Sequence, residues 1–251
     1  MRPQITGDSV KVLYAGDSPV GGAANYLLGV LKFMKADVTH VPPAQKMPAR
    51  LFKKKYDVIL LSDYSHKKLL PGTEEALVRQ VKAGAGLLMV GGWGSFSGPF
   101  GGWRGSLIET VLPVSCSAKD DRLNFPGGAS VGKNSAHQSI KNINLNYAPV
   151  ICGMNRVIPR KKSKVVLHAR KNLSNGKKIR LDSSKHPLLI VSEKKGLKTA
   201  AFTCDFAPHW CGGLVDWGKT TLRLPVNPKI QIQVGDYYVR LISGLIAWLA
   251  S

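Results

Sequence analysis

The stretch "GLLMVGGWGSFSGPFGGWRG", Gly86–Gly105, joins a short apolar run to a loop of glycine, serine and aromatic residues. The run "GLLMV" is typical of a strand that is covered on both faces of a sheet. The glycines after it permit positive φ angles and a close approach of another strand or a ligand. The stretch therefore predicts a buried strand that ends in a loop at the edge of a sheet.

Apolar runs before and after this stretch predict further strands. They are "VKVLYA", "DVTHVP", "YDVILLSD", "HPLLIVSE" and "LKTAAFTCD". Helical spacing occurs at Leu27–Met34, at Pro71–Ala83 with Thr73 as a candidate N-cap, and at Asp236–Ala250. Strands that alternate with helices at this interval indicate βαβ crossovers and a mostly parallel sheet. We therefore expect an α/β protein with a single domain over residues 1–251.

Residues 115–185 interrupt this pattern, because they are rich in Asn, Ser, Lys and Gly. Short runs such as "KVVLHAR" and "KKIRLD" predict hairpins within the segment. We therefore expect a β-rich insertion at about 115–185, in a core formed by about 8–114 and 186–251.

The chain is strongly basic, with 36 Lys and Arg against 15 Asp and Glu and a formal net charge of +21. This charge favours anionic partners, such as nucleic acid or acidic lipid headgroups. The basic residues cluster in "RLFKKKYD", "PRKKSK", "RKNLSNGKKIR" and "SEKKGLK", which indicates a one-sided basic face. No helix-turn-helix, zinc finger or aromatic–basic RNA motif accompanies them, so lysines solvated on loops are the alternative interpretation.

The cysteines are scattered along the chain at Cys116, Cys152, Cys204 and Cys211. This spacing favours reduced thiols and a cytoplasmic location over a disulfide framework. Residues 1–18 contain no apolar run of signal-peptide length. The apolar run Leu241–Ala250 is shorter than the roughly 20 residues of a membrane-spanning helix.

Metal and nucleotide motifs are absent from the sequence. The spacing C-x4-H-x-C of Cys204, His209 and Cys211 is not a zinc signature. Neither a P-loop nor a G-x-G-x-x-G fingerprint occurs at the strand ends. We therefore expect no metal and no cofactor.

Several motifs taken together resemble the class I glutamine amidotransferase-like superfamily. They are "MVGGWGSFSGPFGGWRGSLIETVLPV", "VICGMNRVIP", "LKTAAFTCDFAPHWCGGLVDW" and the terminal "LISGLIAWLA". The resemblance covers most of the chain. It implies a flavodoxin-like sheet with a cleft over the central strands, and an ancestry among enzymes that hydrolyse glutamine.

The resemblance also implies that the site is degenerate. Active members present a nucleophilic cysteine in a sharp turn after a strand, and a later strand supplies histidine followed by glutamate. If "GGWGS" is that turn, Trp93 replaces the cysteine, and an indole neither attacks an amide carbonyl nor forms a thioester. Asp205 directly follows its strand, and His209 precedes Trp210 instead of pairing with a glutamate. We therefore expect no ordinary glutaminase activity.

The main functional hypothesis is a site for a small ligand or partner beyond the carboxyl edge of the sheet, where α/β proteins bind ligands. Its candidate residues are Gly91, Gly92, Trp93, Gly94, Ser95, Asn155, Arg156, Asp205, His209 and Trp210. Asn155 and Arg156 carry groups that bind a carboxylate or phosphate, but a role in pinning the insertion to the core is favoured for them, because most polar side chains support the backbone. A purely structural loop is the alternative for Gly91–Ser95.

Two other hypotheses remain open at this point. One is an unconventional hydrolase in which Ser95 or Cys211 is the nucleophile, His209 the base, and Asp205 or Asp216 the orienting carboxylate. The other is a protein that binds anionic surfaces through its basic face.

Overall fold

The computed structural model describes residues 9–18, 22–176, 178–194 and 196–251. The expectation that no export signal is present concerns residues 1–18, of which 1–8 lie outside the described part. The strands are β1 (Lys11–Gly16), β2 (Asp37–Val41), β3 (Val58–Ser62), β4 (Gly86–Val90), β5 (Val114–Cys116), β6 (Arg122–Lys133), β7 (Val150–Asn155), β8 (Val157–Pro159), β9 (Lys164–Ser174), β10 (Ile179–Leu181), β11 (His186–Lys194), β12 (Leu197–Phe202), β13 (Thr221–Asn227) and β14 (Ile230–Gly235). The α-helices are α1 (Ala24–Phe33), α2 (Thr73–Lys82), α3 (Leu107–Val111), α4 (Pro208–Cys211) and α5 (Asp236–Leu249).

One ten-stranded sheet runs through the molecule in the order β2-β1-β3-β4-β12-β11-β9-β6-β7, and β10 pairs with β9. From β2 to β12 every neighbouring pair is parallel. From β12 to β7 every pair is antiparallel. The predicted α/β class is confirmed: helices flank the parallel part of the sheet, from β2 to β12, and the antiparallel strands extend it.

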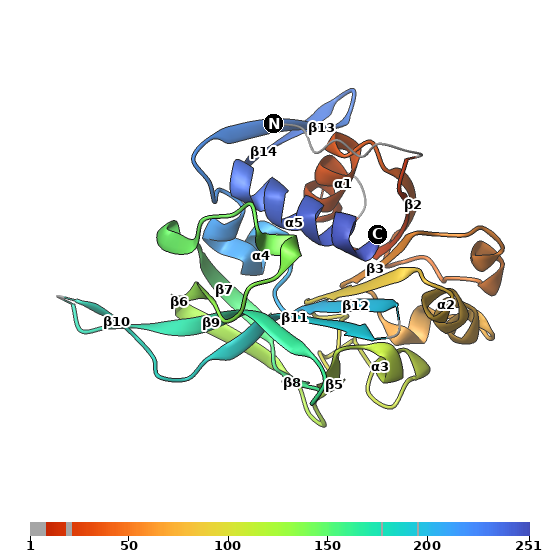
Figure 1. The fold of residues 1–251 in the computed structure, drawn as a ribbon, viewed down its shortest axis with the longest axis horizontal. Helices are drawn as coiled ribbons and strands as arrows, with labels where there is room; N and C mark the ends of the chain where they lie inside the picture. The colour runs from red at the N-terminus through yellow and green to blue at the C-terminus, as the bar shows by residue number, and fades with distance from the viewer. Residues whose placement is uncertain (1–8, 19–21, 177, 195) are drawn as a thin grey trace.

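Helices cover both faces of the parallel strands (Figure 1). The helices α1 and α5 and the β13–β14 hairpin lie on one side, and α2 and α3 lie on the other. Each face has its own apolar core, and every residue of β3 and β4 is buried. This two-sided burial explains why these strands are continuous apolar runs in the sequence.

The predicted β-rich segment contributes strands to the same sheet. Its long strands β6 and β9 lie next to each other, and β11 connects them to the parallel half. The short strands β5 and β8 form a separate pair, as do β13 and β14. The sequence pattern did not predict the β13–β14 hairpin, which packs against α1 at Gly29.

The N-cap predicted for α2 is wrong. Gly72, at φ 77°, takes the N-cap position, and Thr73 is the first residue of the helix. The Thr73 hydroxyl donates a hydrogen bond of 2.9 Å to the carbonyl oxygen of Met47, so it ties the helix to a neighbouring loop. In the part of the chain that the structure describes, no helix is long and apolar enough to cross a membrane.

Candidate functional site

Three aspartates follow strands of the parallel half on the same edge of the sheet. Asp17 comes directly after β1, Asp63 directly after β3, and Asp205 three residues after β12. Because the carboxyl ends of parallel strands meet at one edge, these side chains are brought together although they are far apart in sequence. Asp17 and Asp63 both have positive φ angles, near 50°. Such angles are unfavourable for residues other than glycine and are found at functional sites more often than elsewhere.

The environment of these three carboxyls disfavours their ionised forms. Burial raises the pKa of Asp17 to about 7, the hydrogen bond from the Tyr14 hydroxyl opposes the shift, and the charge of Asp63 adds to it. Burial also raises the pKa of Asp63 and, more strongly, that of Asp205, which the charges of Asp17 and Asp63 raise further. The charges of neighbouring aspartates therefore act on Asp17 and Asp205, and the pKa of each of the three carboxyls lies above its ordinary value.

The Asp63 carboxylate also accepts hydrogen bonds from backbone amides of the loop that follows β4. Its carboxylate accepts a hydrogen bond from the amide of Gly94, and the amide of Trp93 lowers its pKa in the same way. A Cβ atom on Gly92 would lie 2.7 Å from Asp63 Oδ1, so only glycine fits against this carboxylate. The amides of Trp93 and Gly94 therefore already have a hydrogen-bond acceptor within the protein.

Ser95 has its hydroxyl committed to the fold of the same loop. It is buried, its Oγ donates a hydrogen bond of 2.5 Å to the carbonyl of Val90, and it accepts one of 3.0 Å from the amide of Asp63. Both contacts hold the loop to the ends of β3 and β4. The hydroxyl proton is thus donated to a backbone carbonyl and not to a catalytic base.

Asn155 also anchors the loop, through the backbone of Gly92. Its side-chain oxygen accepts a hydrogen bond of 2.9 Å from the Gly92 amide, and its Nδ2 donates to the Gly92 carbonyl at 3.2 Å and to Asp121 Oδ1 at 2.7 Å. Asp121 in turn accepts a hydrogen bond of 2.8 Å from the amide of Ser97. Asn155 is fully buried, so its contacts favour a role in anchoring the insertion over a role in binding a carboxylate or phosphate. Arg156, by contrast, is exposed.

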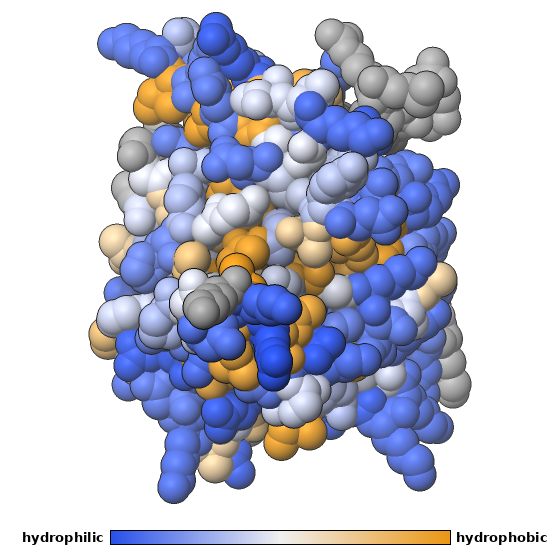
Figure 2. Space-filling view, turned by 90° about the vertical axis from the view of Figure 1, so that its left-hand side faces the viewer, coloured by the Kyte–Doolittle hydropathy of each residue, from blue (hydrophilic) through white to orange (hydrophobic). Residues whose placement is uncertain are grey.

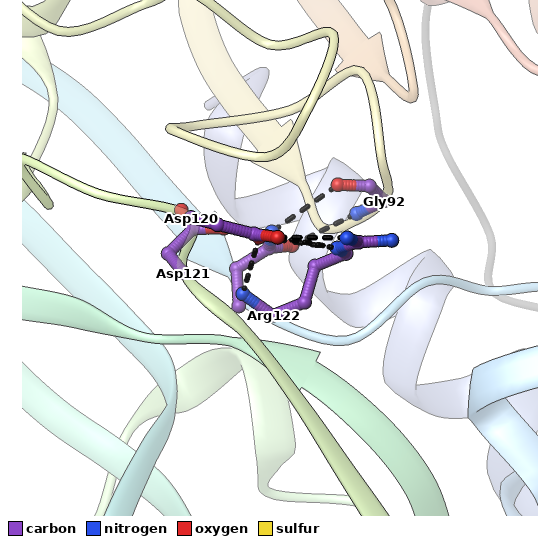
Figure 3. Close-up of polar contacts among 5 residues, drawn as sticks. Gly92, Asp120, Asp121 and Arg122 are labelled. Carbon is purple, nitrogen blue, oxygen red and sulfur yellow. Dashed lines mark hydrogen bonds and ion pairs between the residues drawn. The ribbon is translucent and has the colours of Figure 1, made fainter.

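Trp93 is an exposed aromatic residue of the loop after β4, with 43% of its surface accessible. The Arg122 guanidinium lies 4.4 Å from the centre of the Trp93 ring, and Asp120 holds that guanidinium with bonds of 2.7 to 3.1 Å (Figure 3). Phe100 stacks near the same indole, with ring centres 6.4 Å apart. The indole is thereby held in a fixed place beside the loop while part of it stays open to solvent.

The segment after β12 places its three candidate residues in different environments. Trp210 is buried and packs onto β7, where a Cβ atom on Gly153 would lie 2.4 Å from the Trp210 ring. Cys211 is buried, and burial, followed by the charge of Asp205, raises the pKa of its thiol well above the ordinary value. His209 is exposed, and between described residues no hydrogen bond joins it to Ser95, Cys211 or Asp205. The nucleophile–base pairs of the hydrolase hypothesis are therefore not assembled.

Neither groups of metal-ligating side chains nor cavities add a candidate site at this edge, among the residues that the structure describes. Among the described residues, no group of three or more His, Cys, Asp and Glu side chains is arranged to hold a metal ion. One cavity of about 860 Å³ is lined by residues between Gly132 and Asn146, and one of about 380 Å³ lies near Lys11 and Ser251. No candidate residue lines either of these two cavities.

A family model described as "Putative glutamine amidotransferase" matches residues 18–228. The chain belongs to this glutamine amidotransferase-like family. The match spans the loop after β4, Asn155 and the segment around His209, so it includes every candidate residue that the sequence analysis named. No match was found among curated proteins.

Solved structures confirm the fold. A cytoplasmic protein from Salmonella typhimurium superposes with a TM-score of 0.73 at 24% identity, over 95% of this chain and 98% of its own. A second cytoplasmic protein, from Salmonella typhimurium LT2, gives a TM-score of 0.63 at 24% identity, over 81% of this chain and 91% of its own. A ThuA-like protein from Parabacteroides merdae gives 0.59 at 14% identity, over 97% and 91%.

Asp17 and Asp63 are not among the site residues that the sequence analysis named. Asp17 and Asp63 each follow an apolar run directly, as Asp205 nearly does, and this shared position was the available signal. The role of Asp121 had no such signal, because its partner Asn155 is 34 residues away and the contact depends on the pairing of β6 with β7.

Proposed function

We propose that this glutamine amidotransferase-like protein lacks glutaminase activity and binds a small polar ligand at the carboxyl edge of its parallel strands. The contact of Asp63 with the loop amides carries this proposal. A glutaminase needs a nucleophile in the loop after β4 and free donors for the developing oxyanion. Residues 91–105 contain no cysteine, and the protein's own carboxylate holds the amides.

The ligand that suits this edge is neutral or positively charged. Asp17, Asp63 and Asp205 place carboxyl groups at this edge, and such groups repel an anion when ionised and donate or accept hydrogen bonds when protonated. Trp93 adds an aromatic surface that packs against the apolar part of a polar molecule. A polyhydroxylated compound or an amine meets both requirements.

The hydrolase alternative has no specific support, because Ser95 and Cys211 are buried and neither bonds to His209. We place the protein in the cytoplasm, in line with its scattered cysteines.

A thermal-shift screen grouped by ligand charge tests the proposal, since a ligand that binds the folded state raises its melting temperature. We expect amines or polyols to raise the melting temperature of the wild type, and Asp205→Asn and Trp93→Ala to weaken that shift. Asp216→Asn is the matched control, because Asp216 is an exposed aspartate in the segment between α4 and β13. Glutamine should yield no ammonia with the purified protein. Ammonia release that survives removal of contaminants, or stabilisation by anions only, would contradict the proposal.

A further inference from the structure

The end of β9 and the short strand β10 form a hairpin at one end of the molecule (Figure 1). Strand β10 pairs only with residues 172–174 of β9, so its outer edge is free of any described strand. All three residues of β10 are exposed. The hairpin therefore has water, and no layer of protein, over β10.

Aliphatic side chains are nevertheless concentrated on this hairpin. Leu173, Ile179 and Leu181 have 44%, 71% and 43% of their surfaces exposed. In the register, Leu173 faces Arg180, while Ile179 and Leu181 face Ser174 and Asn172. Side chains of directly paired residues share a face, so the hairpin presents aliphatic groups on both of its faces. Grouped exposed aliphatic residues indicate a contact surface.

The segment that contains the hairpin is also the most basic part of the chain. From 156 to 185 the sequence has eleven Lys and Arg residues and one acidic residue, Asp182. The Asp182 carboxylate caps a local turn through the amide of Ser184, at 2.9 Å. None of the ion pairs between described residues includes a member of this segment. Its positive charge is therefore available to an external anionic surface.

Figure 2 views the molecule from the end at which β10 lies. Hydrophilic side chains dominate this view, with small apolar patches among them. The exposed aliphatic residues of the hairpin lie in the most basic segment of the chain, so this end combines apolar with positively charged side chains.

We propose that the β9–β10 hairpin docks on the surface of an acidic lipid bilayer. In this contact, Ile179 and Leu181, which share one face of the hairpin, enter the boundary between headgroups and acyl chains, and the long basic side chains of Lys171, Lys178 and Arg180 reach acidic headgroups around them. The free edge of β10 stays at headgroup depth, where water and headgroups satisfy its backbone groups.

Nucleic acid fits this surface less well. Single-stranded nucleic acid is bound by aromatic side chains that stack on bases, and residues 157–185 contain no Phe, Trp or Tyr. Aliphatic side chains gain little from a phosphate backbone, but they gain transfer free energy on entering a bilayer. The proposal is independent of the ligand site at the carboxyl edge.

Vesicle co-sedimentation of the full-length protein provides the test. We expect binding to phosphatidylcholine vesicles with about 30% phosphatidylserine, weak binding to phosphatidylcholine alone, and a decline as salt increases. A duplex DNA competitor at equal charge should displace little protein. Absence of binding to the acidic vesicles, or preferential binding to the DNA, would overturn the proposal.

Two comparisons of variants distinguish a specific contact of the hairpin from attraction due to the protein's net charge alone. Ile179→Ser/Leu181→Ser should lower vesicle partitioning about tenfold, because two aliphatic side chains no longer insert. Leu107→Ser, which alters a leucine of similar exposure (45%) on α3, should leave partitioning unchanged.

Lys178→Gln/Arg180→Gln should lower vesicle partitioning about tenfold or more. The control Arg79→Gln/Lys82→Gln on α2 has the same net charge and should have little effect. Circular dichroism checks that each variant is folded, and Leu181→Ser alone is the milder second variant. Equal effects of variant and control in both pairs would refute a specific hairpin contact.

Discussion

The two halves of the sheet differ in burial and in charge. In the parallel half, every residue of β3 and β4 is buried between two helical layers, whereas in the antiparallel half every residue of β10 is exposed. The carboxyl edge of the parallel half gathers three aspartates, and the antiparallel half includes the basic segment 156–185. One continuous sheet therefore combines a rigid, acidic edge with a basic, solvent-exposed extension.

The difference shows that packing on both faces of a strand fixes the backbone conformation at its ends. Strands that are packed on both faces have no freedom to shift, so the loops at their ends are held in strained conformations such as those of Asp17 and Asp63. A hairpin that is covered by nothing carries no such constraint. We therefore expect substitutions to have large effects at the first location and small effects at the second.

The largest expected effect is that of Gly91→Ala at the joint of β4 and β12. The new Cβ atom would lie 2.2 Å from the carbonyl oxygen of Thr203, which is backbone held between strands. We expect a loss of about 3 kcal/mol or more in the free energy of unfolding, measured by urea denaturation. Gly127→Ala in β6, whose Cβ atom would lie 3.1 Å from the Asn172 carbonyl oxygen, should cost less than about 1 kcal/mol. Equal losses would show that the two halves are equally constrained.

Asn155→Ala should have the next largest effect. It removes the partner of the Gly92 amide and carbonyl and of Asp121, all at the buried base of the loop. We expect a loss of about 2 to 3 kcal/mol, because buried polar groups are left unsatisfied. Asn172→Ala, in the half-buried part of β9, should cost less than about 1 kcal/mol, since its side chain accepts one hydrogen bond from Ser130. Urea denaturation of both variants at the same pH makes the comparison, and a costlier Asn172→Ala would reverse it.

Asp17→Asn tests the electrostatics of the acidic edge. The pKa of Asp17 is raised to about 7 in the fold, so between about pH 4 and pH 7 the folded state keeps a proton that the unfolded state releases. The stability contributed by this proton is fully present below about pH 4 and is lost as the pH rises through 7.

The asparagine variant removes this dependence, since an amide does not ionise. We expect it to match the wild type near pH 4 and to be more stable by roughly 2 kcal/mol at pH 8, an effect that cannot exceed about 4 kcal/mol. Thermal unfolding over this pH range measures the difference, with Asp216→Asn as the control. A variant that is less stable than the wild type at pH 8 would mean that Asp17 is ionised and held by a favourable partner.

The smallest expected effect is that of Ile179→Ala at the exposed hairpin. This side chain contributes little to the core, so the free energy of unfolding should change by less than about 0.5 kcal/mol. Ile190→Ala, in the buried centre of β11, removes the same atoms and should cost about 2 to 5 kcal/mol. Chemical denaturation of the two variants compares them directly. A large loss at Ile179 would indicate that the hairpin is packed against the protein in solution.

The sequence predicted the buried strands better than the exposed ones. The runs that became β1, β3, β4 and β12 are mainly apolar because helices cover both of their faces, and the family resemblance rested on the loops at their ends. The strand β6 and the hairpin β13–β14 were not predicted individually. Their residues alternate between buried and exposed and include glycine, proline and charged residues, so local pattern alone does not distinguish them from loops.

The sequence by itself determined the α/β class, the family and the excess of positive charge, because these depend on local periodicity, motifs and composition. Only the tertiary structure decided that Asp17, Asp63 and Asp205 meet at one edge, that Asn155 holds the loop after β4, and that the β-rich segment extends the central sheet. The physical reason is that these contacts join residues tens to hundreds of positions apart. Strand order and register create them, and neither is encoded in any short stretch of the chain.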